Sequence, residues 1–154
     1  MKNILLHQNF FSVGESVCLI DGQKIEDSNK KMQAVNRMRK AQCGRPLKAD
    51  KRYSNELPSI TCTIYTNGFN SLLVKSHFIS KDESDRRIVY QFFTEDISNA
   101  TKTLQSYCAQ LGMKLHPKDC EVINKLITKQ RKKTIFAILL LSITLLIILL
   151  FLTF

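Results

Sequence analysis

The feature that most constrains this chain is an uncharged apolar run at residues 134–154, TIFAILLLSITLLIILLFLTF. A helix over these 21 residues would rise ~1.5 Å per residue and span ~31 Å, about the thickness of a hydrocarbon core. The run is apolar on every face, whereas a surface helix of a soluble domain keeps a polar face. We therefore expect residues 134–154 to be a transmembrane anchor, which excludes a purely soluble protein and a multi-pass channel.

Basic residues border the apolar run on its N-terminal side only. They are Lys129, Arg131, Lys132 and Lys133. Lys and Arg in short flanks stay on the cytoplasmic side of a membrane. The sequence thus predicts a tail-anchored, single-pass protein with a cytoplasmic N-terminal domain. Its small size favours a bacterial inner membrane over a eukaryotic organelle membrane.

Composition changes sharply along the chain and predicts three segments. Residues 1–117 are polar enough for a cytoplasmic domain, residues 118–133 form a basic juxtamembrane helix, and residues 134–154 form the anchor. The apolar patterns that predict the sheet and the two helices all end before Lys118. We therefore expect a fragment that ends at Lys118 to fold on its own.

Alternating or apolar-rich stretches predict the strands of this domain. They lie at residues 4–11, 16–20, 23–25, 59–65, 69–79 and 87–93, with a possible short edge strand at 113–115. The last three long stretches are joined by short polar turns, which is typical of an antiparallel meander. The sequence therefore predicts a small antiparallel sheet of five to six strands.

Two stretches have the apolar spacing of helices. In residues 28–42, Met32, Val35 and Met38 recur every three positions, and Ala34 and Ala41 extend the stripe. The second helix is predicted to begin at about residue 96 or 98 and to end at 111. We expect both helices to cover one face of the sheet in an α+β fold. Residues 44–58 contain few apolar residues and are predicted to be an exposed loop.

The residues that usually carry catalysis or bind metals show no recognisable spacing. His7, His77 and His116 are far apart, and the five cysteines include no C-x-x-C pair. The sequence also lacks a G-x-S-x-G nucleophile motif and a glycine-rich phosphate loop. We therefore predict no catalytic, cofactor-binding or metal-binding residues, and a protein that is not an enzyme.

Residues 24–52 carry ten Lys or Arg against three acids, a net charge of +7 within a chain of net charge +10. Three interpretations compete: a solvated surface, a contact with anionic lipid, or a site for an acidic protein or nucleic acid. The absence of Trp and of a groove-entering motif argues against nucleic acid. The membrane-surface contact that we predict comprises Arg45, Lys48, Lys51 and Arg52, together with Lys129, Arg131, Lys132 and Lys133.

These observations favour a protein that presents a small cytoplasmic protein-interaction domain at a membrane, in an accessory or regulatory role. Its expected partners are the lipid bilayer and another protein. The alternative is a membrane-tethered enzyme or ligand sensor whose site has no sequence motif.

Overall fold

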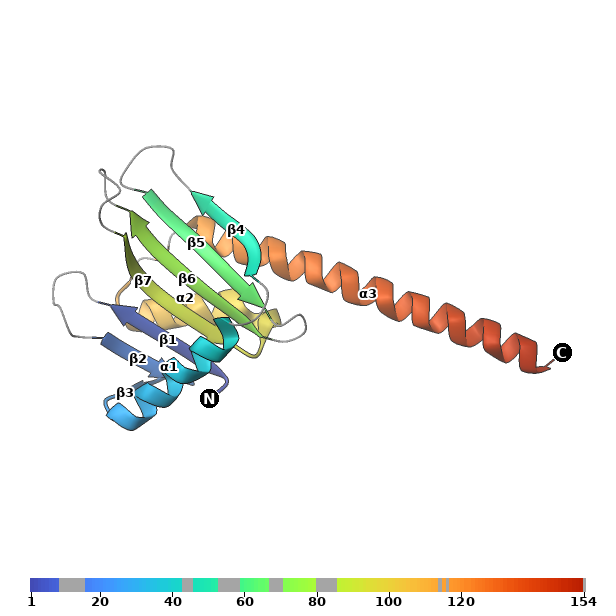
Figure 1. The fold of residues 1–154 in the computed structure, drawn as a ribbon, viewed down its shortest axis with the longest axis horizontal. Helices are drawn as coiled ribbons and strands as arrows, with labels where there is room; N and C mark the ends of the chain where they lie inside the picture. The colour runs from blue at the N-terminus through green and yellow to red at the C-terminus, as the bar shows by residue number, and fades with distance from the viewer. Residues whose placement is uncertain are drawn as a thin grey trace.

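An α+β domain with one long projecting helix is what the computed structural model shows (Figure 1). The structure describes residues 1–8, 16–42, 46–52, 59–66, 71–79, 86–113, 115 and 117–153. The strands are β1 Asn3–Gln8, β2 Ser16–Ile20, β3 Gln23–Ile25, β4 Pro46–Arg52, β5 Ser59–Thr66, β6 Leu72–Ile79 and β7 Arg86–Thr94. The helices are α1 Ser28–Gln42, the short 3-10 helix η1 Ile97–Asn99, α2 Ala100–Gln110 and α3 Pro117–Thr153.

All strands form one antiparallel sheet in the order β3-β2-β1-β7-β6-β5-β4. The predicted meander is confirmed, because β6 pairs with β5 on one side and with β7 on the other. The pairing of β1 with β7 joins this meander to the N-terminal hairpins. The first strand of the chain therefore lies inside the sheet, next to the central strand β7, although the two strands are far apart in sequence.

Within the described residues the sheet has seven strands rather than the predicted five to six. The additional strand is β4, which occupies part of the predicted loop 44–58 and pairs with β5 at the edge of the sheet. A shift in register between Leu47 and Lys51 interrupts this pairing. The possible edge strand at 113–115 is absent from the described residues there, since Met113 and Leu115 lie in no strand.

The turn between β2 and β3 is built on Asp21 and Gly22, whose φ angles are 49° and 85°. Positive φ at both central residues is the conformation of a tight hairpin turn that Asp-Gly adopts readily. The carboxylate of Asp21 also accepts hydrogen bonds from the backbone N–H groups of Lys2 at 2.9 Å and Asn3 at 2.8 Å. This turn therefore fixes the start of β1.

Apolar side chains are buried on both faces of the sheet, and a different helix covers each face. On one face α1 buries Ala34 and Met38 against Ile4, Leu6 and other residues of the sheet. On the opposite face α2 contributes Leu104 and Cys108 to a larger core. The expectation that both helices share one face is therefore wrong, and Figure 1 shows α1 and α2 on opposite sides of the sheet.

The predicted apolar stripe of α1 is only partly buried. Ala34 and Met38 are buried, and Val35 and Ala41 pack at the margin of the core. Met32, however, is 62% exposed. The packed apolar residues of the helix begin at Ala34, so Met32 lies outside the interface with the sheet.

The first turns of α3 belong to the core beneath α2. Val122, Ile123 and Ile127 are buried there. Thr101 in α2 also donates a hydrogen bond to Asn124 in α3 across 2.7 Å. The packed domain therefore continues past Pro117, into the segment that the sequence assigns to a juxtamembrane helix.

Candidate functional site: an apolar helix and a cationic pocket

The C-terminal half of α3 is an apolar helix that no described part of the domain covers. Large side chains from Ile135 to Leu150 are 47–66% exposed. Within the part of the chain that the structure describes, one helix is long and apolar enough to cross a membrane, and the candidate span runs from Asp119 to Leu150. An exposed apolar surface of this length is costly in water and favourable in lipid.

The hydroxyl groups of Ser142 and Thr144 in this half-helix are satisfied within the helix. Ser142 donates its hydroxyl proton to the carbonyl groups of Ile138 and Leu139, each at 2.9 Å. Thr144 likewise bonds to the carbonyl of Leu141 at 2.8 Å. These hydroxyl groups therefore do not prevent the helix from entering a hydrocarbon environment.

A buried hydrogen bond fixes the start of α3 to the sheet. The Tyr90 hydroxyl in β7 donates to Oδ2 of Asp119 across 2.6 Å, and both residues are almost fully buried. Burial raises the pKa of the Tyr90 hydroxyl well above 10.0, and the neighbouring Asp119 charge raises it further. Tyr90 therefore keeps its proton and remains a donor to the helix.

The predicted membrane-surface residues lie in two separate elements. Lys129, Arg131, Lys132 and Lys133 are exposed on α3, between its buried first turns and its apolar half. Lys48, Lys51 and Arg52 fall on the edge strand β4, while Arg45 lies outside the described residues. The structure thus places a basic collar on the helix and a basic strand at one edge of the sheet.

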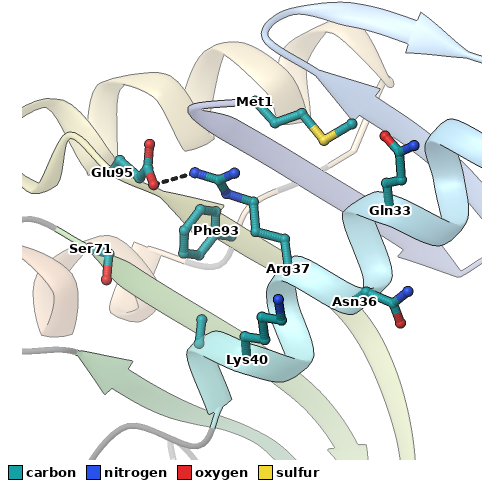
Figure 2. A pocket seen from close by; sticks show the side chains of 9 residues that line it. Met1, Gln33, Asn36, Arg37, Lys40, Ser71, Phe93 and Glu95 are labelled. Atoms are coloured by element: carbon teal, nitrogen blue, oxygen red, sulfur yellow. Dashed lines mark hydrogen bonds and ion pairs between the residues drawn. The ribbon is translucent and has the colours of Figure 1, made fainter.

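An open pocket of about 600 Å³ lies between α1 and the sheet end formed by β7 and β6. Its lining residues come from α1, β7 and the segments next to β1 and β6 (Figure 2). They are Met1, Gln33, Asn36, Arg37, Lys40, Ala41, Ser71, Phe93 and Glu95. The volume is in the range of small-molecule binding sites.

Arg37 crosses the middle of this pocket. Its guanidinium group lies 5.7 Å from the centre of the Phe93 ring and forms an ion pair with Glu95 (Figure 2). A cation over an aromatic face is stabilised by the ring quadrupole. Both contacts hold Arg37 in one orientation, although its side chain is 42% exposed.

Three further polar side chains of the pocket, all on α1, have unused hydrogen-bonding capacity. Lys40, Gln33 and Asn36 form no side-chain hydrogen bond or ion pair in the described part of the chain. All are exposed on α1. Sequence analysis did not single out this pocket, because its lining residues come from distant parts of the chain and share no motif. Arg37 and Lys40 do belong to the basic segment 24–52.

Metal binding and thiol chemistry find little support in the described residues. No group of three His, Cys, Asp or Glu there lies close enough to hold a metal ion. Burial raises the pKa of Cys108 to about 12, and burial also raises the pKa of Cys18 and Cys120. A thiol with a raised pKa is a poor nucleophile at neutral pH. Cys43 lies outside the described residues.

Comparisons with known proteins give no relative that could assign a role. No protein-family model matches the chain, and neither a curated protein nor a solved structure matches it. The functional argument therefore depends on the apolar helix, the basic collar and the pocket.

Proposed function

We propose that this chain is a single-pass membrane protein whose cytoplasmic α+β domain binds another protein at the membrane surface, in an accessory or regulatory role. The observation that supports it is the continuity of α3. The helix begins among buried core residues and continues without interruption into an exposed apolar half. A single rigid element thus connects the domain with the segment suited to lipid.

The proposed orientation depends on the basic collar. Lys129, Arg131, Lys132 and Lys133 lie beside the apolar half of α3, where Lys and Arg favour the cytoplasmic side of a membrane. The collar would also be attracted to anionic lipid, at ~1 kcal/mol for each basic residue near the surface. We therefore place the domain in the cytoplasm.

A second candidate function is a membrane-tethered ligand sensor. The pocket between α1 and β7 supports it, because its polar side chains face open space beside a fixed arginine. A sensor and a protein-binding module are compatible, since a ligand in this pocket would contact α1. A binding role needs no catalytic group.

Membrane integration is tested by cell fractionation followed by alkaline carbonate extraction. We expect the full chain to stay in the membrane pellet and a chain that ends at Thr128 to be soluble. Release of the full chain by carbonate would contradict the proposal. The shortened chain is the control, because it keeps the buried turns of α3 and lacks the apolar half.

Orientation is tested with a cysteine placed on the exposed surface of α2. In Lys102→Cys, a membrane-impermeant maleimide should add label only after the cells are lysed. The unsubstituted chain measures the labelling of its own cysteines, of which Cys18, Cys62 and Cys108 are buried. Extra label in intact spheroplasts would place the domain outside the cytoplasm.

A further inference from the structure

We infer that the pocket between α1 and β7 binds a phosphate ester that also carries a hydroxyl or ammonium group. Such a group is found on lipid head groups and on small soluble phosphates. The preference for a lipid ligand rests on the proposed membrane attachment. The preference for a phosphate group rests on the pocket alone.

Donor groups dominate the pocket. The Lys40 ammonium group, the amide groups of Gln33 and Asn36, and the N–H groups of Arg37 that Glu95 does not use can all donate hydrogen bonds. A phosphate group offers several acceptor oxygens and a negative charge. The guanidinium group is planar and matches a pair of phosphate oxygens.

Arg37 is held ready for such a ligand. The Glu95 carboxylate and the Phe93 ring fix its guanidinium group, and the neighbouring Ala34 and Met38 anchor this part of α1 to the sheet. A ligand would therefore meet a donor that is already oriented, which lowers the entropy cost of binding.

Glu95 explains why the ligand should carry a donor as well as a phosphate. The ion pair uses Oε1 of Glu95, and the Glu95 side chain, which lines the pocket, is 41% exposed. A bare anion would be repelled by this carboxylate, whereas a hydroxyl or ammonium group could donate to it. The pocket therefore favours a phosphate ester of a small alcohol or amine over inorganic phosphate.

The position of the pocket favours a lipid source. It lies where β5 and β7 end and β6 begins, near the C-terminal end of α1. In Figure 1 this end of the sheet faces the direction in which the apolar half of α3 extends. If that half crosses a bilayer, the pocket lies on the membrane-facing side of the domain.

The experiment follows the side-chain amide signals of Gln33 and Asn36 by NMR, in the full chain embedded in phosphatidylcholine nanodiscs. The probes are dihexanoyl phosphatidylglycerol, glycerol phosphate, inorganic phosphate and dihexanoyl phosphatidylcholine. We expect saturable shifts with the first two probes, with a Kd below about 1 mM. Tighter binding of the short-chain lipid supports a lipid source, and equal binding of glycerol phosphate supports a soluble ligand.

Two lysine variants on the same helix provide the matched comparison. Lys40→Gln should weaken binding about tenfold, because it removes a charge-assisted hydrogen bond. Lys30→Gln removes the same charge from an exposed position outside the pocket and should leave affinity unchanged. Equal weakening of binding in both variants would show that only the overall charge of the chain matters. That result would overturn the inference.

Three other results would also overturn it. These are no saturable shift with any probe, equal binding of phosphatidylcholine and phosphatidylglycerol probes, and tightest binding of inorganic phosphate. Co-purification of the chain with the nanodisc measures membrane insertion independently of ligand binding. A chain that fails to insert contradicts the proposed function, and the same titration in neutral detergent then still tests the pocket.

Discussion

Tyr90 of β7 donates its hydroxyl proton to Asp119 of α3 across 2.6 Å, in the buried layer between the sheet and the long helix. This contact joins the centre of the domain to the element that carries the apolar half. Any movement of α3 relative to the sheet must therefore break or stretch a buried hydrogen bond.

Tyr90→Phe should lower the free energy of unfolding by about 1.5–3 kcal/mol at neutral pH, because it removes a buried hydrogen bond to a carboxyl group. The pKa of Tyr90 in the folded chain is well above 10.0. The unfolded chain therefore releases the proton first as the pH rises past 10, and stability falls in that range. The Phe side chain of the variant cannot ionise, so the variant lacks this loss of stability.

Denaturant titrations of both proteins between neutral pH and pH ~11 check this prediction. The difference in unfolding free energy between the native chain and Tyr90→Phe should shrink above pH 10. A difference that stays constant over this range would show that Tyr90 ionises equally in both states. Comparison of the two proteins cancels the titration of the other tyrosines and lysines.

A chain that ends at Lys118 should fail to fold, whereas a chain that ends at Thr128 should fold. The longer fragment keeps Val122, Ile123 and Ile127, which are buried beneath α2. Burial of an apolar side chain contributes ~1.5–3 kcal/mol, so their loss removes about 5–9 kcal/mol from a typical total of 5–15 kcal/mol.

Circular dichroism and thermal unfolding of the two fragments give the measurement. We expect a cooperative transition for the chain that ends at Thr128 and none for the shorter chain. The sequence alone predicts instead that the fragment ending at Lys118 folds. Equal melting temperatures would mean that the first turns of α3 add little to the core.

The strands and helices were largely predictable because each has a strong local pattern. Residues 28–42 form the predicted helix, and residues 16–20 form the predicted strand, with the same bounds. Strand β4 was missed because Pro46–Arg52 has few apolar residues. An edge strand needs a partner on one side only, and β5 supplies it.

The sequence does contain a pattern that indicates helices on opposite faces of the sheet. Ile4, Leu5 and Leu6 are consecutive apolar residues, and a strand with one solvated face would alternate instead. In the structure Ile4 and Leu6 lie in one core and Leu5 lies in the other. The pocket had no such signal, because it depends on how α1 crosses the ends of β6 and β7.

The basic collar should determine the orientation of the apolar helix. A variant with Lys129, Arg131, Lys132 and Lys133 changed to Gln removes all of the Lys and Arg next to the apolar run. We expect a mixed topology, with part of the population carrying the domain on the opposite side of the membrane. Maleimide labelling of Lys102→Cys in intact spheroplasts measures the inverted fraction.

The matched control changes Lys24, Lys30, Lys31 and Lys40 to Gln, which removes the same charge far from the apolar run. Residues at this sequence distance contribute little to orientation. The control should therefore keep a uniform topology. If the collar variant also keeps it, the domain itself would determine the orientation through its folding before insertion.

The last prediction concerns the basic residues at and near β4. Changing Arg45, Lys48, Lys51 and Arg52 to Gln in the chain that ends at Thr128 should remove most binding to anionic vesicles. Binding by the unchanged fragment should fall as salt rises, because surface attraction decays over ~8 Å at physiological salt. We expect the four substitutions together to change the free energy of unfolding by less than about 1 kcal/mol.

The position of β4 at the sheet edge adds a second expected result for this variant. Lysines on an edge strand discourage pairing with a second sheet. The variant should therefore self-associate more strongly, which analytical ultracentrifugation measures alongside vesicle co-sedimentation. Equal binding to neutral and anionic vesicles, or no loss of binding in the variant, would contradict the lipid contact. Increased self-association without a change in vesicle binding would assign these charges to protection of the edge.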